Sequence, residues 1–181
     1  MLSSEDALTY MPSFTITNRK KQEFVVHHDE EDTELLAQYT WHVAQGYVST
    51  SGIRPDGGRY PLRMHRRIME AYEGMEVDHV NGNPLDNRKK NLRFCTRAEN
   101  MWNRSINKVN GSGFKGVYWH NQRMKFQAQI GINKKRKNLG FFQTALAAAH
   151  AYNAGAKKFF GEFARLNKLP VLSSFHRRNM T

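Results

Sequence analysis

The sequence predicts an α+β protein built from two units that are joined by a short linker. Three patterns carry this prediction: N-terminal β-hairpin material, a strand-loop-strand-helix order in the middle, and a C-terminal three-stranded antiparallel sheet packed on one helix. The expected boundaries are a first domain at 1–104, with a β-rich part at 11–64 and a core at 76–104, a linker at 105–112, a second domain at 113–168 and a tail at 169–181.

The N-terminal part has the composition of hairpins and short helices. Aromatic and β-branched residues are interrupted by polar turns, which is typical of hairpins. An acidic run favours a helix start, because the helix dipole stabilises carboxylates there. The expected elements, in order, are a hairpin at 14–26, a short helix beginning at 29–34, a hairpin at 41–50, a turn at 54–58, a strand at 60–64 and a short helix at 65–72.

The middle of the chain predicts a strand at 76–80, a long loop, a strand at 92–95 and a helix at 97–104. Thr96 and Glu99 fit a capping box, in which each side chain satisfies a backbone N–H of the first helical turn. The helix start is therefore fixed, and with it the direction of Asn100.

The C-terminal part begins after an Asn-, Ser- and Gly-rich linker. A strand at 115–120 and a turn precede a strand at 125–132, in which apolar residues alternate with polar ones. A basic turn at 133–137 should lead to a third strand at 138–142, and Thr144 should cap an alanine-rich helix at 145–160. One helix covers only one face of the sheet, so the other face is free for polar contacts.

The positive charge is concentrated in the C-terminal part. The chain of 181 residues has a formal net charge of +12, but residues 1–107 carry 14 Lys and Arg against 15 Asp and Glu, whereas residues 108–181 carry 14 against 1. Such an asymmetry indicates a division of labour, with a polyanion as the partner of the basic part. We expect nucleic acid, and specifically duplex DNA, rather than a membrane or a protein partner.

The single cysteine, Cys95, excludes an intrachain disulfide and a thiolate-rich zinc site, and we expect it to be a buried small apolar residue. No apolar run approaches the roughly 20 residues of a membrane span. Glu5 and Asp6 do not fit a secretory signal. A soluble, cytoplasmic and non-secreted protein is therefore expected.

Residues 78–100 contain the pattern DH-x-N-G-N-x-x-D-N-x-x-x-N-L-R-x-x-T-x-x-E-N. Asp78 and Asn100 offer hard oxygen ligands for magnesium or manganese, and His79 offers a base that is largely neutral at pH 7. Neighbouring strand residues point to opposite faces, so Asp78 and His79 share one site only where the strand ends or bends. Asn91 fits a brace that hydrogen-bonds across the loop.

At this pattern the chain resembles the HNH endonucleases of the ββα-metal type, specifically the phage- and intron-borne homing group, strongly over 60–104 and more loosely over 11–52. The resemblance implies that His79 is the general base and that Asn91 orders the loop. It implies one Mg²⁺ or Mn²⁺ per site, held by Asp78 and Asn100, with Asn103 as an alternative ligand. Structural zinc, common in this family, is excluded here by the cysteine count.

Two further residues resemble the His-Arg pair often found just before the HNH motif. For this pair, His65 and Arg66, phosphate contact and structural packing are both open.

Residues 113–167 resemble the Apetala or ethylene-response-factor DNA-binding domain, through KGVY at 115–118, the strand at 126–130, LGxF at 139–142, the helix residues at 147–152 and RLN at 165–167. In that family the sheet enters the major groove. The corresponding face here is Lys115, Tyr118, His120, Arg123, Lys125, Gln127, Gln129 and Arg136, while Lys135 and Lys137, with Lys134, should neutralise phosphates.

The sequence therefore predicts a metal-dependent DNA endonuclease with a homing or mobile-element role, acting in a bacterial or phage-infected cell. One alternative is a non-catalytic sequence-specific DNA-binding regulator with a degenerate HNH unit, and another is an RNA-binding or RNA-cleaving protein. The target sequence, nicking or double-strand cutting, and a monomeric or homodimeric state stay open.

Overall fold

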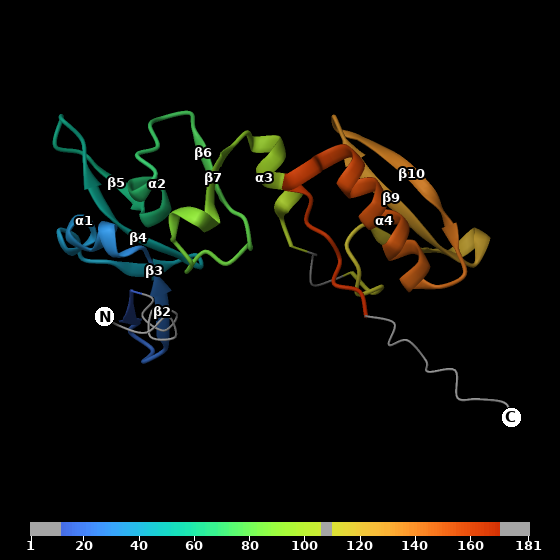
Figure 1. Cartoon of the computed structure of the whole chain (residues 1–181), viewed down its shortest axis with the longest axis horizontal. Coiled ribbons are helices and arrows are strands. Elements are labelled where there is room, and N and C mark those ends of the chain that lie inside the picture. The colour runs from blue at the N-terminus through green and yellow to red at the C-terminus, as the bar shows by residue number, and fades with distance from the viewer. Residues whose placement is uncertain (1–11, 106–109, 171–181) are drawn as a thin grey trace, which may run out of the picture. The chain divides into compact units, whose positions relative to one another are not determined.

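The computed structural model describes residues 12–105 and 110–170, and the chain divides into a first unit, 1–103, and a second unit, 104–181 (Figure 1). Both units combine small antiparallel sheets with helices, which confirms the predicted α+β class. Parts of the predicted linker at 105–112 and tail at 169–181 lie outside the described residues, as does residue 11. None of the helices in 12–105 and 110–170 has both the length and the apolar character needed to cross a membrane.

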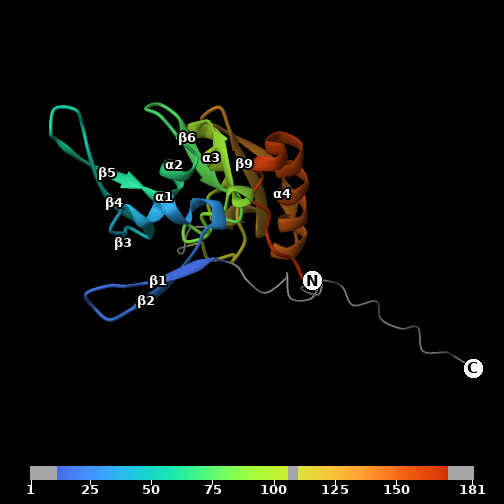
Figure 2. The ribbon, with the colours of Figure 1, turned by 60° about the vertical axis from the view of Figure 1, so that its left-hand side comes forward.

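The first unit begins with the hairpin of β1 (Ser13–Thr17) and β2 (Glu23–His27), a two-stranded ribbon that Figure 2 shows clearly. Its turn is closed by Asn18, whose Oδ1 accepts hydrogen bonds from the backbone N–H groups of Lys20 and Gln22 at 2.9 and 3.0 Å. The acidic run then forms the short 3-10 helix η2 (Glu30–Asp32) and α1 (Thr33–Ala37). The predicted hairpin and short helix are both confirmed.

A three-stranded antiparallel sheet follows, in the order β3-β4-β5. It consists of β3 (His42–Ala44), β4 (Tyr47–Ile53) and β5 (Arg59–Arg63), and it leads directly into α2 (Met64–Ile68).

The helix predicted at 65–72 is shorter than expected. Glu70 adopts a left-handed φ of 49°, which ends the helix. The Arg66 guanidinium then donates hydrogen bonds to the carbonyls of Ala71, Tyr72 and Met75, so that the chain folds back on the helix instead of extending it.

The middle segment forms the predicted strand-loop-strand-helix order: β6 (Glu76–His79), η3 (Lys89–Asn91), β7 (Leu92–Cys95) and α3 (Arg97–Asn103). The capping box is present, since Glu99 Oε2 accepts from Thr96 N at 2.7 Å and Thr96 Oγ1 accepts from Glu99 N at 3.3 Å. Cys95 is half-buried rather than buried, and desolvation raises the pKa of its thiol to about 11. A thiol with that pKa is almost entirely protonated at neutral pH.

One apolar core joins most elements of the first unit. Its buried members come from the N-terminal hairpin, α1, the three-stranded sheet, α2 and the β6–β7 pair: Ile16, Val26, Leu36, Val48, Met64, Ile68, Val77 and Leu92. The β6–β7–α3 segment therefore has no core of its own, and the preceding β-rich part contributes directly to its support.

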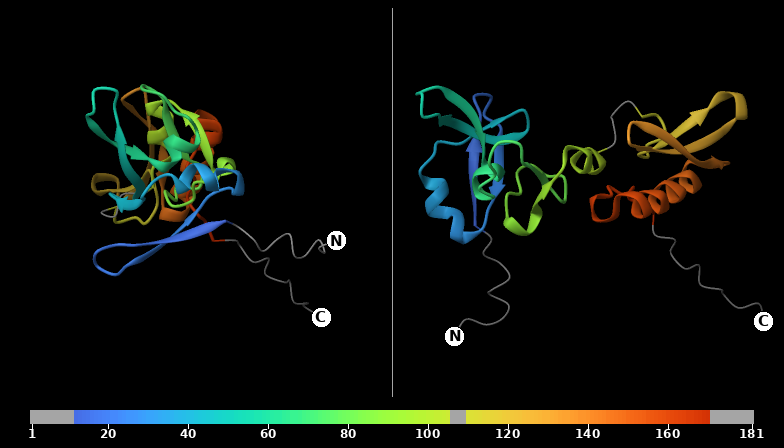
Figure 3. Two further views of the ribbon diagram at one scale, coloured as in Figure 1. Left: turned by 90° about the vertical axis from the view of Figure 1, so that its left-hand side faces the viewer. Right: turned by 90° about the horizontal axis from the view of Figure 1, so that it is seen from above.

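The second unit is an antiparallel sheet in the order β10-β9-β8, with α4 (Ala145–Phe160) along one face (Figure 3, right). The strands are β8 (Val117–His120), β9 (Lys125–Ile132) and β10 (Lys135–Phe142), with η4 (Asn121–Arg123) after β8 and η5 (Gly161–Phe163) after α4. Thr144 caps α4 as predicted, because its Oγ1 accepts from Ala147 N at 3.1 Å.

The turn predicted at 133–137 consists of only two residues. Asn133 and Lys134 have φ values of 50° and 62°, the backbone that a two-residue hairpin turn requires. Residues 135–137 therefore belong to β10 and alternate between its two faces, contrary to the prediction of a basic turn.

Gly116, in the predicted KGVY motif, allows a close approach between the chain and α4. A Cβ atom there would lie 2.0 Å from Cδ2 of Tyr152, and the residue has a φ of 73°. Only glycine satisfies both conditions.

Candidate active site

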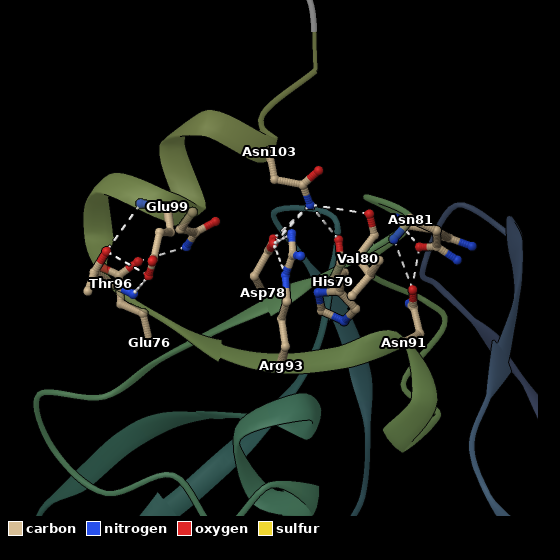
Figure 4. A network of polar contacts seen from close by, with 12 residues as sticks. Glu76, Asp78, His79, Val80, Asn81, Asn91, Arg93, Thr96, Glu99 and Asn103 are labelled. Atoms are coloured by element: carbon tan, nitrogen blue, oxygen red, sulfur yellow. Dashed lines mark hydrogen bonds and ion pairs between the residues drawn. The ribbon is translucent and has the colours of Figure 1, made fainter. Parts of the chain in front are cut away.

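The ββα segment brings Asp78, His79, Asn91 and Asn103 together at the end of β6 (Figure 4). β6 ends at His79, in agreement with the expectation that the strand stops or bends there. The two neighbouring side chains still have separate surroundings. Asp78 contacts β7 and α3, whereas His79 contacts the loop that follows it and rings from β4 and α2.

Asp78 is buried and held by two residues. It is the cross-strand partner of Arg93, whose Nε and Nη2 lie 3.2 and 2.9 Å from Asp78 Oδ2. Asn103 Nδ2 lies 3.1 and 2.9 Å from the two carboxylate oxygens. The carboxylate is thus fixed in place, with a guanidinium on one side and a carboxamide on the other.

The structure places Asn103, and not Asn100, beside Asp78. Asn103 Nδ2 also donates to His79 O at 2.8 Å, while Asn100 Nδ2 donates to Glu76 Oε2 at 2.7 Å. α3 runs along β6 in the same direction, and three helical residues advance about 4.5 Å, so the later asparagine reaches the end of the strand. The predicted Asp78–Asn100 pairing is therefore not formed, and the alternative residue occupies its place.

His79 is a buried, neutral histidine. Desolvation lowers the pKa of His79, against smaller upward effects of the Asn87 hydrogen bond and the Asp78 and Asp86 charges. Its Nε2 lies 3.3 Å from Asn87 Oδ1. A neutral imidazole at pH 7 has a lone pair available to accept a proton.

Two aromatic rings surround His79. The His65 ring packs against it edge-on, with centroids 4.8 Å apart and planes at 74°, and the Tyr47 ring lies 6.2 Å away. Arg63 stacks on Tyr47, with its guanidinium carbon 4.3 Å from the ring centroid. These contacts come from β4, β5 and α2, so the β-rich part of the unit forms one wall of the site.

Asn91 lies at the centre of the loop's hydrogen bonds. Its Oδ1 accepts from Asn81 N at 2.9 Å, and its Nδ2 donates to Asp86 O at 2.7 Å and to Asn81 Oδ1 at 3.1 Å. Its backbone oxygen accepts from Val80 N at 2.8 Å. One carboxamide thus joins both ends of the loop at 80–91.

Asp86 is in turn fixed by a salt bridge to Arg88, with Nε 2.7 Å from Oδ1. The hydrogen bond from Arg88 lowers the pKa of the Asp86 carboxyl. The loop is therefore braced by polar contacts of Asn91, Asp86 and Arg88.

The predicted phosphate contacts His65 and Arg66 have structural surroundings. His65 is only 3% exposed, and burial lowers its pKa to about 3, with further lowering by the charges of His79, Arg63 and Arg66. The Arg66 guanidinium is engaged by the three carbonyls after α2. The sequence left phosphate contact and structural packing open for His65 and Arg66, and the observed contacts of both residues correspond to structural packing.

Three residues of the site had no role in the sequence interpretation. Asn87 and Arg93 stand in the motif, and their contacts follow from the loop conformation and from the register of β6 with β7. Tyr47 carries no local signal, because its contact with the site is purely tertiary. Register was the one feature that could have identified Arg93, since residues directly opposite on two strands share a face.

The donor set suits a hard cation. Within the described parts of the chain, no group of three or more His, Cys, Asp or Glu side chains is placed to hold a metal ion. Asp78 and Asn103 instead offer one carboxylate and one amide, and the amide already contacts the carboxylate. Few protein ligands and open positions for water and phosphate are what Mg²⁺ prefers.

In the second unit, strand register defines the sheet face opposite α4. Val117 and Ala128 are paired and buried under the helix, so their neighbours point away from it. The opposite face carries Tyr118, His120, Lys125, Gln127, Gln129, Arg136 and Phe141. We call this set the open sheet face.

Arg123 joins this face from η4, with its guanidinium carbon 4.5 Å from the Phe141 ring centroid. His120 packs edge-on against the same ring at 5.2 Å. Gln127 Nε2 donates to Asn138 Oδ1 at 3.3 Å. Phe141 was not predicted, because the position of the bulge between Asn138 and Gly140 decides its face.

Three lysines that were predicted to bind DNA do not lie on the open sheet face. Lys137 stacks on the Phe159 ring of α4, with Nζ 5.4 Å from the centroid, and Lys135 shares its side of β10. Lys115 Nζ donates to Arg104 O at 2.7 Å, and burial lowers the pKa of Lys115 to about 8, with the Arg165 and Arg104 charges adding to the effect. The basic residues therefore do not form one continuous reading face.

Comparisons with known proteins agree with the geometry of the first unit. The family model described as HNH endonuclease matches residues 63–102. Protein 3.8 of Escherichia phage T7 is 32% identical over 108 residues, which are 57% of this chain and 88% of that protein. "Uncharacterized HNH endonuclease L560" of Acanthamoeba polyphaga mimivirus is 29% identical over 170 residues, 91% of this chain and 83% of that protein. No solved structure gives a significant match.

Proposed function

Because the chain belongs to the HNH endonuclease family and is a DNA-cleaving hydrolase, we propose that it cuts with His79 as general base and a divalent cation at Asp78 and Asn103. The observation that carries the proposal is a buried imidazole with a lowered pKa and a fixed carboxylate on consecutive residues at the end of β6.

His79 would remove a proton from the water that attacks phosphorus. Its lowered pKa keeps it unprotonated at pH 7, and the surrounding rings restrict its orientation. Asn91 holds the loop that follows His79, so that the base stays at the strand end. A bound divalent cation supplies charge stabilisation for the phosphate and the leaving oxygen.

Asp78 and Asn103 are the residues that would hold the cation, Mg²⁺ or Mn²⁺, one per site. Asn103 directs Nδ2 toward Asp78, and turning its amide would present Oδ1, an oxygen that hard cations bind. Asn100 is engaged with Glu76, one helical turn away, and therefore is not included in this ligand set.

Nicking of supercoiled plasmid in Mg²⁺ tests this assignment. His79→Ala should cut about 10²- to 10⁴-fold more slowly, the usual range for a lost general base, while retaining DNA binding. A chelator should abolish cutting by the wild type. Unchanged cleavage by His79→Ala would refute the role of His79, and cleavage that resists chelator would refute the metal dependence.

The second unit is proposed to direct the nuclease to duplex DNA through the open sheet face. The support is its net basic composition, its resemblance to Apetala or ethylene-response-factor domains, and the face that α4 leaves uncovered. Lys115, Lys135 and Lys137 are left out of this proposed face because of their positions.

Adjacent residues of β10 provide a matched test. Arg136 lies on the open sheet face and Lys137 on the helix side, so each change to Gln removes one charge from a different side of the same strand. Arg136→Gln should weaken DNA binding roughly 10-fold, and Lys137→Gln much less. Equal losses of DNA-binding affinity in the two variants would show that binding depends on the total charge and not on the side of β10 that carries it.

A homing or mobile-element role fits a nuclease centre combined with a separate DNA-binding unit, and the two similar proteins come from viruses. One centre per chain favours nicking by a monomer, and two chains on a symmetric site would cut both strands. Mapping the cleavage ends on both strands of a randomised library distinguishes these outcomes.

A further inference from the structure

Asn87 is fully buried and faces the imidazole of His79. None of its surface is exposed, and its Oδ1 lies 3.3 Å from His79 Nε2. Hydrogen bonds of catalytic groups are often long before substrate binds. A buried carboxamide beside a proposed base has no solvent to satisfy it, so its orientation determines what the histidine can donate or accept.

The surroundings of Asn87 decide that orientation. Its Nδ2 donates to Pro84 O at 3.4 Å, which leaves Oδ1 toward the imidazole. The reversed amide would place Oδ1 against the Pro84 carbonyl, two acceptors without a proton between them. The carboxamide therefore presents an acceptor to His79 Nε2.

The backbone of Asn87 is anchored to the N-terminal hairpin. Asn87 N donates to His27 O at 2.8 Å, and His27 N donates to Leu85 O at 2.9 Å. His27 also forms an isolated bridge with Asp86. The end of β2 thus holds the loop segment from which Asn87 reaches His79.

We propose that Asn87 is a positioning residue that fixes neutral His79 in the tautomer carrying its proton on Nε2, and so makes Nδ1 the basic nitrogen. Within the described residues, His79 Nδ1 makes no hydrogen bond. The proton that His79 takes from water is thus received at Nδ1, while the Nε2 proton stays with Asn87. This inference rests on the proposed role of His79 as base.

The tautomer is measured directly by long-range ¹H–¹⁵N correlation NMR of the ¹⁵N-labelled full chain, without metal or DNA, at pH 7.5. The His79 ring signals are identified by their absence in His79→Gln. We expect a ring protonated at Nε2. A wild-type ring protonated at Nδ1 would overturn the proposal without any variant at Asn87.

Three variants separate positioning from packing. Asn87→Asp keeps an acceptor and should keep the tautomer, whereas Asn87→Leu removes it and should give a mixture, with nicking slowed roughly 10- to 100-fold. Asn83→Ala, an exposed loop residue whose Oδ1 accepts from Leu85 N, is the control and should leave the tautomer unchanged. An unchanged tautomer in folded Asn87→Leu would contradict the inference.

The NMR result is independent of the cleavage result. If His79→Ala still cuts DNA, the base assignment fails whatever the tautomer is. If that variant is inactive and the wild-type proton is on Nδ1, only the role of Asn87 fails. If Asn87→Leu does not fold, the His79 tautomer measured in the wild type and in Asn87→Asp decides whether the proposed role of Asn87 holds.

Discussion

Mild acid should destabilise the first unit through His65. This ring is buried against His79, and burial lowers its pKa from 6.5 to about 3. In the unfolded chain the ring would titrate near its ordinary value, so between these two pKa values the unfolded state binds more protons than the folded state. Stability is therefore fully present above about pH 6.5 and is lost as the pH falls toward 3.

The size of the effect follows from the two pKa values. The interval from 6.5 to about 3 corresponds to about 5 kcal/mol below pH 3, at about 1.4 kcal/mol per pKa unit. Between pH 7.5 and pH 5, the same titration removes about 2 kcal/mol. This loss is a large part of the stability of an ordinary domain.

Urea unfolding at pH 7.5 and pH 5 measures this loss. A Trp119→Phe background leaves Trp41 and Trp102 as reporters, both in the first unit, which avoids mixing the transitions of the two units. In that background His65→Phe keeps a ring but removes the titrating group. Between pH 7.5 and pH 5, the unfolding free energy of His65→Phe should therefore fall by about 2 kcal/mol less than that of the parent. His42→Phe, at an exposed position of β3, is the control. Equal pH dependence of the parent and His65→Phe would refute this reasoning.

The metal site gives two further predictions. Arg93→Gln removes the guanidinium from Asp78, so the metal-free first unit should lose about 3 kcal/mol of unfolding free energy. Mn²⁺, measured by EPR, should bind this variant more tightly because a neighbouring positive charge is gone. Weaker Mn²⁺ binding would contradict this reasoning. Asn103→Ala should weaken Mn²⁺ binding roughly 10-fold or more, whereas Asn100→Ala should not, because of these two asparagines it is Asn103 that contacts Asp78. The reverse result would identify Asn100 as the ligand.

The local elements of the site were predictable, and their packing was not. The capping box of Thr96 and Glu99 correctly gave the start of α3, because it depends on residues three apart in the sequence. Which turn of that helix reaches Asp78 depends on where α3 lies along β6. That is a tertiary relation, and so the choice between Asn100 and Asn103 had to come from the structure.

The sheet of the second unit shows the same limit. Alternation along β9 correctly separated Ala128 and Ile130 from Gln127 and Gln129, since side chains alternate along any strand. The basic run at 133–137 looked like a turn because of its composition. Positive φ values at its first two residues shorten the turn and send Lys137 to the helix side.

The N-terminal hairpin and the three-stranded sheet both contact residues of the proposed catalytic site. The HNH family match begins at residue 63, the last residue of β5, yet His27 backbone atoms hold Leu85 and Asn87, and the Tyr47 ring borders His79. Since β6, β7 and α2 also share one core with that preceding part, the matched segment of 63–102 contains His79 and Asp78 without all the contacts that orient them, and Asn103 lies one residue beyond it. A fragment limited to 60–104 would therefore lack half of the buried core, Ile16, Val26, Leu36 and Val48, and the contacts of His27 and Tyr47 with the site.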